Sequence, residues 1–440
     1  MASRVGDRPR PGHPLVSFGF GGKLVVMFTR KKVALAGFIP RPGGAAPAPP
    51  GADDDKPRKG PIAIKSLADV LADTPLLQSV RRFPGPLFSG ASVNDVAAYL
   101  GDGGLHAAAI AASRSPDSPH DAMLLNRILV VLCQQGGTLT PRRGSSATLS
   151  PSSTEANSVS RDLRQAILDT TPPQHAPAGG GQYRLRPAAG DDSLAAAMAD
   201  VERLLAAGDR KAACDRAVAG ELWAHALIIS SNVTKEVYQG VVAAFVQATI
   251  PEASPLRTLY GTFAGDMSGS VAGASLAQWR TSLAAMLANR TAGDARLLEA
   301  LGEKLQDQAG ATAAAHACFL LGGRSLEGAR PEARMVLLGA DHRGYKDTFL
   351  RDVLALQRTE VYEFAKRQGN SQSNLPAFQP FKLIYAMLLA DLGLLDAARK
   401  YVACITKVVK DCGGGGGGGG GASVFSRTFV TQLRVFEDRL

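Results

Sequence analysis

The stretch that decides the fold is Leu15-Val-Ser-Phe-Gly-Phe-Gly-Gly-Lys-Leu-Val-Val-Met-Phe28. It predicts two short strands joined by a Gly-Gly turn, because apolar runs flank the glycine pair. In the second strand Leu24, Val26 and Phe28 point to one side of the sheet, and Val25 and Met27 point to the other. Both faces of this strand are apolar, which is typical of a strand that is buried on both sides.

A third candidate strand, Pro61-Ile-Ala-Ile-Lys65, places Ile62 and Ile64 on one face, and no convincing strand follows it in the sequence. A three-stranded sheet with two apolar faces is barely stable alone. The sequence offers no second sheet to cover it. We therefore expect the sheet to complete the structure of another protein, which favours a scaffold over an enzyme.

Composition narrows the class of protein further. The chain has 440 residues, 45% of them hydrophobic but only 6% aromatic, which favours closely packed helices. Its net charge is +10, from 49 Lys and Arg against 39 Asp and Glu; residues 1–60 hold 11 and 4 of these, or +7. A nucleic-acid binder should carry its basic excess on a folded face, whereas here it flanks strands and linkers. We expect no nucleic-acid partner, and an acidic partner or an anionic membrane surface fits the N-terminal charge better.

Other features exclude several site types. The five cysteines include no Cys-x-x-Cys pair, so neither a disulfide framework nor a zinc site is indicated, and buried thiols in a reducing compartment are expected. No apolar run approaches the ~18 residues that span a membrane, and the start of the sequence lacks a signal-peptide pattern. Gly19-Phe-Gly-Gly-Lys23 is not a phosphate-binding loop, because Ser17 and Leu24 occupy positions that need Gly and Ser or Thr.

Composition and periodicity divide the chain into six parts. In order they are the β-rich segment 15–66 with a flexible loop at 40–60, a helical segment 67–136, a mostly disordered insertion 137–192 broken by a short helix at Val159–Leu168, a solenoid of helices at 193–408, a poly-Gly tether at 413–421, and a C-terminal docking helix at 422–440. In the solenoid, amphipathic helices end at glycines, among them Gly220, Gly310 and Gly393. No strict period recurs, which predicts a mainly α fold built as an irregular solenoid.

The C-terminal segment and the helix Glu221–Ser230 carry apolar faces. Phe425, Phe429, Leu433, Phe436 and Leu440 recur at helical spacing, which predicts one face that docks on the solenoid. In Glu221–Ser230, the residues Trp223, Leu227 and Ser230 share a face that we expect to be core.

The sequence contains one loop that could be drawn as acid–base machinery, Asp341-His342-Arg343. No nucleophile motif such as Gly-x-Ser-x-Gly accompanies it. His225 and His316 lie in helical patterns without a partner at metal-ligand spacing, which favours packed or half-exposed histidines. We therefore expect no catalytic, cofactor-binding or metal-binding residues, and an enzyme with a site near Asp341 and His342 is the less favoured alternative.

Several blocks together resemble one family. They are Ser17–Phe28, Phe83-Pro-Gly-Pro-Leu87, Gly220-Glu-Leu-Trp-Ala-His-Ala-Leu-Ile-Ile-Ser-Ser231, Trp279-Arg280 with Leu287-Ala-Asn-Arg290, Ala313-Ala-Ala-His-Ala-Cys-Phe319, Leu338-Gly-Ala-Asp-His342, Phe349-Leu-Arg-Asp352 with Thr359-Glu-Val-Tyr-Glu-Phe364, and Lys382-Leu-Ile-Tyr385 with Leu392-Gly-Leu-Leu395. In this order they resemble the central conserved domain of the Sec-sixteen family, the scaffold of COPII budding sites on the endoplasmic reticulum.

The resemblance implies an architecture and a set of partners. The helices would form a folded-back trunk, and the N-terminal strands a β-blade that completes the open β-propeller of a Sec-thirteen-like partner. The residues implied in partner binding are Phe18, Phe20, Leu24, Val25, Val26, Met27, Phe28, Ile62 and Ile64. Two copies would pair through a crown in the helical region, around residues 233–330.

The function implied is that of a non-catalytic scaffold that organises COPII coat assembly and vesicle budding. It would contact other coat components and lie on the cytoplasmic face of the endoplasmic reticulum at exit sites, as a peripheral protein. A related coat or nuclear pore scaffold with the same blade-plus-solenoid design is the nearest alternative.

Overall fold

A computed structural model of the chain describes residues 15–28, 61–88, 91–112, 118–139, 154–171, 191–251, 254–264, 276–290, 293–344, 349, 352–413 and 424–440. The loop expected at 40–60 and residues 414–421 of the expected tether lie outside the described residues. The chain divides into two compact units, which are described separately. Unit 1 combines Met1–Pro86 with Phe378–Leu440, and unit 2 is Leu87–Ala377.

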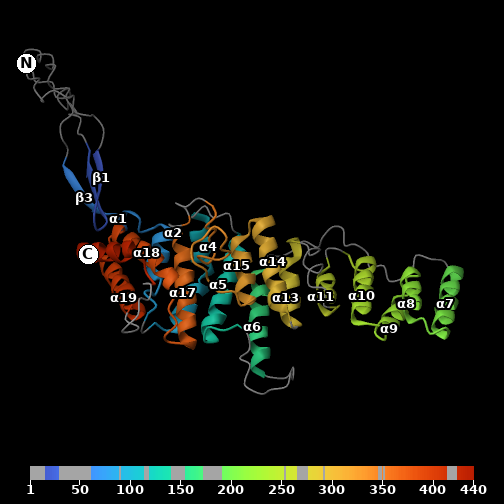
Figure 1. The fold of residues 1–440 in the computed structure, drawn as a ribbon. Coiled ribbons are helices and arrows are strands. Elements are labelled where there is room, and N and C mark those ends of the chain that lie inside the picture. The colour runs from blue at the N-terminus through green and yellow to red at the C-terminus, as the bar shows by residue number, and fades with distance from the viewer. Residues whose placement is uncertain are drawn as a thin grey trace, which may run out of the picture. The chain divides into compact units, whose positions relative to one another are not determined.

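Unit 1 contains the predicted sheet. Strands β1 (Leu15–Gly19), β2 (Lys23–Met27) and β3 (Ile62–Ser66) are antiparallel, in the order β1-β2-β3 (Figure 1). In the register of the sheet, Val26 of the central strand lies opposite Val16 on one side and Ala63 on the other. The β1–β2 turn includes Gly21 and Gly22, both with positive φ, so the predicted glycine turn is confirmed. We call this three-stranded sheet the blade.

The rest of unit 1 is helical. Its helices are α1 (Leu67–Val70), α2 (Pro75–Arg82), α18 (Gln379–Asp391), α19 (Leu395–Gly413) and α20 (Arg427–Arg439). α18 and α19 pack as a pair, and α20 lies against both. The buried side chains of the α20 segment are Phe425, Phe429, Leu433 and Phe436, which are the apolar positions that the sequence predicted, whereas Leu440 is half-buried.

The blade meets the α18–α19 turn through backbone atoms. A Cβ atom at Gly22 would lie 2.5 Å from the backbone nitrogen of Gly393, a distance that no other residue type could accept. Gly22 has a φ of +68°, which also favours glycine. The Leu67 N–H donates a hydrogen bond of 2.7 Å to the Gly22 carbonyl, which ties the start of α1 to the same point. We call the contact between Gly22 and Gly393 the glycine joint.

Unit 2 is built from helices. They are α3 (Val93–Gly101), α4 (Gly103–Ala112), α5 (Pro119–Gln134), α6 (Thr154–Thr170), α7 (Asp191–Ala206), α8 (Arg210–Ala219), α9 (Trp223–Ser230), α10 (Lys235–Thr249), α11 (Pro255–Ala264), α13 (Trp279–Ala288), α14 (Asp294–Ala309), α15 (Thr312–Leu321) and α17 (Val353–Gly369), with a short 3₁₀ turn η1 (Leu276–Gln278) before α13 and another, η2 (Pro376–Phe378), before α18.

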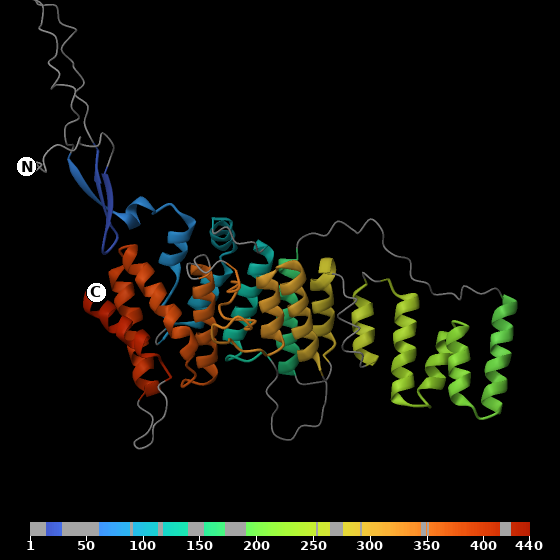
Figure 2. The same ribbon diagram turned by 45° about the horizontal axis from the view of Figure 1, so that its top comes forward.

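The helices of unit 2 fold back on themselves. α7 to α11 pack in chain order, each against the next (Figure 2). The later helix α13 then lies against the early helix α6, and α15 and α17 lie against α5. Segments far apart in sequence therefore share one core, and the predicted class, a mainly α folded-back solenoid with a three-stranded N-terminal sheet, is confirmed.

The centre of unit 2 is helix α17, in which every residue from Val353 to Ala365 is buried. Polar groups on it form buried hydrogen bonds to other segments, as most buried polar groups do. Tyr99 Oη donates to Gln357 Oε1 at 2.6 Å, and the Leu87 N–H donates to Glu360 Oε1 at 2.8 Å. These bonds fix α17 against two segments that precede it by more than 250 residues, since the separations are 258 and 273.

The insertion predicted at 137–192 needs a correction. Helix α6 runs over Thr154–Thr170, beyond the short helix expected at Val159–Leu168, and packs against α5 and α13. Its buried residues include Val159, Leu163 and Ile167, which recur at spacings of four and four on one face. The helix expected at Val159–Leu168 is thus present, but it is longer than expected and its buried face is part of the core; residues 140–153 and 172–190 lie outside the described residues.

The face predicted for α9 is also shifted. Ala226, Ile229 and Ser230 are buried, whereas Trp223 and Leu227 are half-buried at the edge of the core. At the preceding turn, Gly220 ends α8 as predicted.

Candidate functional site

The two faces of the blade are defined by its register, because residues opposite each other in antiparallel strands lie on the same side. One face, here called the Ile face, carries the rows Leu15–Met27–Ile62 and Ser17–Val25–Ile64. The other, the Phe face, carries Val16–Val26–Ala63 and Phe18–Leu24–Lys65, with Phe28 continuing the alternation beyond β2.

Both faces expose large apolar side chains. Phe18 is 71% exposed on the Phe face, and Ile62 and Ile64 are 67% and 68% exposed on the Ile face. Exposed apolar groups gathered in one place mark interaction sites. The outer edges of β1 and β3 are also free of strand partners within the described residues, and such edges are templates for pairing with another chain. The blade thus offers two faces and two edges to a partner.

The blade brings together eight of the nine predicted partner-binding residues. Phe18, Leu24, Val26 and Phe28 belong to the Phe face, and Val25, Met27, Ile62 and Ile64 to the Ile face. The exposed Leu15 and Val16 belong to the same surface and were missed, although they begin the stretch that predicted the strands.

Phe20, the ninth residue, lies elsewhere. It is in the β1–β2 turn and not in a strand, and the Arg439 guanidinium of α20 lies 5.0 Å from its ring centre. This cation–π contact gives Phe20 a role inside unit 1. The strand alternation that placed it with Phe18 stops at Gly19, where β1 ends.

The less favoured alternative from the sequence, a site near Asp341 and His342, lies in the loop that follows α15, residues 322–344, here called the polar loop. His316 of α15 is fully buried beneath it and is bonded through both ring nitrogens. The Gly339 N–H donates to Nδ1 at 3.0 Å, so Nε2 carries the proton and donates to the Arg334 carbonyl at 3.2 Å. His316 therefore pins the loop to the helix as a neutral imidazole.

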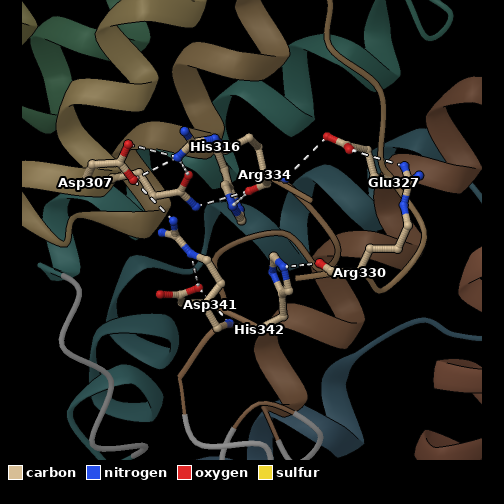
Figure 3. Close-up of polar contacts among 9 residues, drawn as sticks. Asp307, His316, Glu327, Arg330, Arg334, Asp341 and His342 are labelled. Atoms are coloured by element: carbon tan, nitrogen blue, oxygen red, sulfur yellow. Dashed lines mark hydrogen bonds and ion pairs between the residues drawn. The ribbon is translucent and has the colours of Figure 1, made fainter. Parts of the chain in front are cut away.

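Asp307 of α14 anchors the outside of the same loop. Arg334 Nη1 donates to its two carboxylate oxygens at 2.8 and 3.0 Å, and Arg343 Nη1 donates to Oδ1 at 3.2 Å (Figure 3). The hydrogen bond from Arg334, and then that from Arg343, hold the pKa of Asp307 below its ordinary value against the effect of burial. These contacts join two points of the loop to one helix.

Asp341 and His342 bind different partners. Asp341 Oδ1 accepts hydrogen bonds from the backbone N–H and the Nε of Arg343, at 3.0 and 3.1 Å. Burial alone would raise the pKa of Asp341, but these bonds outweigh it and leave the pKa lowered. His342 Nε2 lies 2.9 Å from the Arg330 carbonyl. The geometry is that of a braced loop, and gives no support to an acid–base pair formed by these two residues.

Burial of two histidines predicts a pH dependence of stability. Desolvation lowers the pKa of His316 to about 4, and desolvation with the nearby Arg358 charge lowers that of His106 to about 4, from an ordinary 6.5. The unfolded chain therefore binds protons at a higher pH than the folded chain. The free energy of unfolding should fall as pH drops from 6.5 to 4, by about 2 kcal/mol per histidine between pH 7 and pH 5.

Denaturant titrations at pH 7 and pH 5 check this. His316→Gln should reduce the difference in unfolding free energy between the two pH values. An equal pH dependence in the wild type and His316→Gln would contradict the assignment.

Within the described residues, no cluster of His, Cys, Asp and Glu is arranged to hold a metal ion. The described helices also include none that is long and apolar enough to cross a bilayer.

Comparisons with known proteins agree on one family. Residues 201–440 match the model of the Sec16 Sec23-binding domain, and residues 13–137 match that of the mid-region of the vesicle coat trafficking protein Sec16. The chain is 31% identical over 428 residues to the protein transport protein SEC16A homolog of Arabidopsis thaliana, which covers 92% of this chain and 30% of the relative. It is 30% identical over 451 residues to the COPII coat assembly protein sec16 of Aspergillus niger, which covers 91% and 22%.

The chain thus spans less than a third of the length of these two relatives. Among solved structures, the Sec13/Sec16 complex of S. cerevisiae aligns with a TM-score of 0.56 at 16% identity, over 98% of this chain and 100% of that chain, which supports the fold. The first family model alone matches more than half of the sequence, and so the chain belongs to the Sec16 (Sec-sixteen) family.

Proposed function

We propose that this chain is a non-catalytic scaffold for COPII coat assembly that works by lending its blade to a Sec13-like β-propeller. The observation that carries the proposal is the blade itself, a sheet with exposed apolar side chains on both faces and, within the described residues, no strand partner at its outer edges. A propeller blade is a small sheet held between two neighbouring sheets, so both its faces must be apolar. The two faces of the blade are apolar, as this requires, but in the free chain they are exposed to water.

The relatives support the direction of the proposal. Their names include coat assembly and protein transport, and the solved structure of similar fold is a complex with Sec13. Insertion into a propeller would bury the eight face residues Phe18, Leu24, Val25, Val26, Met27, Phe28, Ile62 and Ile64, and would pair the edges of β1 and β3 with main-chain groups of the partner.

We propose that the helices of the chain bind further partners. The family description names Sec23 binding for the region that matches residues 201–440, which suggests other coat components as partners of these helices. Self-association is proposed around residues 233–330, where Tyr238, Leu256 and Phe263 expose apolar surface. Light scattering of the propeller complex at micromolar concentration tests it, and a strictly monomeric chain would count against it.

Co-expression with a Sec13-like propeller from the same organism tests the proposed function. The full chain should co-purify with the propeller, and a chain lacking residues 1–66 should not, while circular dichroism shows that its helices remain. Retention of the propeller by the truncated chain would contradict the blade proposal.

A tagged copy in cells separates the scaffold functions that share this architecture. Accumulation at endoplasmic reticulum exit sites is expected, as a peripheral protein on the cytoplasmic face. Accumulation at the nuclear rim would favour a pore scaffold instead.

A further inference from the structure

One residue does not fit an apolar blade. Lys65 lies on the Phe face of β3, in the row that it forms with Leu24 and Phe18. Within the described strands it is the sole charged residue on this face, because the next row is Val16–Val26–Ala63. A covered Phe face would therefore enclose one positive charge among apolar side chains.

The other lysine of the blade is placed differently. Lys23 lies on the Ile face in the last row before the turn, between Gly19 and Ser66, both of which are small. Its ammonium group is at the end of the sheet and can stay in water. Lys65 is one row further into the sheet, in the row of the exposed Phe18 ring. The two lysines can thus be compared directly. Lys65 lies within the surface that a partner would cover, whereas Lys23 lies at the end of the sheet.

The energetic problem at Lys65 follows from desolvation. Removing an ammonium group from water without a compensating charge costs several kcal/mol, whereas a paired and hydrogen-bonded charge is tolerated. No ion pair or hydrogen bond of the Lys65 side chain is found within the part of the chain that the structure describes. A carboxylate on whatever covers the Phe face would compensate this charge.

We propose that Lys65 pairs with a carboxylate on the blade of the partner propeller that stacks on the Phe face, and that this pair helps to select the partner. The proposal rests on the proposed function, since it needs a propeller to cover the face. The acidic residue would lie opposite the row of Phe18, Leu24 and Lys65, among side chains that fill the space above the small Ala63. A propeller with an apolar or basic residue at that place would leave one charge unpaired and be rejected.

Snorkelling is the competing arrangement, in which the lysine stem covers apolar surface and its ammonium group reaches water past the edge of β3. Lys65→Met distinguishes the two, because methionine keeps an apolar stem of similar length and removes the charge. With snorkelling, methionine should bind equally well or better. With a buried pair, methionine leaves the partner's carboxylate enclosed without a countercharge, and binding weakens.

The experiment is isothermal titration of the full chain with a Sec13-like propeller from the same organism, together with Lys65→Met, Lys65→Arg, Lys65→Glu and the control Lys23→Met. We expect Kd to rise about tenfold or more for Lys65→Met and further for Lys65→Glu, and to change little for Lys65→Arg and Lys23→Met. Unchanged or tighter binding by Lys65→Met would overturn the pairing while leaving the blade proposal intact. No binding by the wild type would overturn the proposed function and this inference with it.

Discussion

Val26→Asp should abolish binding of the propeller while the helices of both units stay folded. Val26 is in the central strand, 7% exposed, between Val16 and Ala63. A carboxylate there would be enclosed between stacked sheets, which costs several kcal/mol when it is unpaired. Each 1.4 kcal/mol is about tenfold in Kd, so binding should weaken by at least about a hundredfold. Co-purification and titration with the propeller measure the loss, and circular dichroism monitors the helices.

Two further variants separate loss of the interface from damage to the blade. Phe18→Ala removes a ring that is already exposed in the free chain, so the sheet should persist while Kd rises. Val435→Asp makes the same substitution at an exposed valine of α20, outside the blade, and should bind normally. Full binding by both Val26→Asp and Phe18→Ala would mean that the Phe face is not covered in the complex.

Arg280→Met should lower the free energy of unfolding of unit 2 by about 3–5 kcal/mol, the usual effect of breaking a buried ion pair. The Arg280 guanidinium on α13 forms an ion pair with Asp121 of α5, and both side chains are buried. Its Nη1 also donates to the Thr170 carbonyl at the end of α6, at 2.6 Å. Methionine would leave the Asp121 carboxylate buried without its countercharge and the carbonyl without its donor. Denaturant unfolding monitored by circular dichroism measures the loss.

The double variant Asp121→Asn with Arg280→Met is the control for charge. It removes the uncompensated carboxylate, and should recover part of the stability that Arg280→Met loses. Arg203→Met is the matched surface control, since both side chains of its ion pair with Asp200 are exposed, and it should lower the free energy of unfolding only slightly. A loss of that small size for Arg280→Met as well would show that the buried pair does not hold the fold-back.

What the sequence could predict was mostly local. The alternation of apolar residues with a glycine pair between them was enough for β1 and β2, and the spacing of Phe425, Phe429, Leu433 and Phe436 was enough for the buried face of α20. Each pattern extends over a few turns or one strand. The spacing of apolar side chains along one helix or strand shows which of them share a buried face.

What the sequence could not predict depends on contacts between distant segments. Asp121 and Arg280 are separated by 159 residues, and the local sequence around each gives no sign that the two side chains form a pair. Phe20 looked like a strand residue because it continues the alternation from Phe18, and its contact with Arg439 was missed because Arg439 is at the far end of the chain. For α6 a local signal did exist, since Val159, Leu163 and Ile167 share a face, and a short helix was expected there. The surrounding Ser, Thr and Pro residues favoured disorder, so the full length of the helix and its place in the core were missed.

The glycine joint has a mechanical consequence. Between Gly22 and Gly393 main chain meets main chain, so no rotatable side-chain bond lies between the blade and the α18–α19 turn to absorb a load. A force on the blade would therefore be transmitted directly to the backbone of the α18–α19 turn, with no side-chain rotation to absorb it. The direction in which a bound partner projects from these helices is then set by backbone geometry. The two faces can change in sequence to suit another partner without turning that direction.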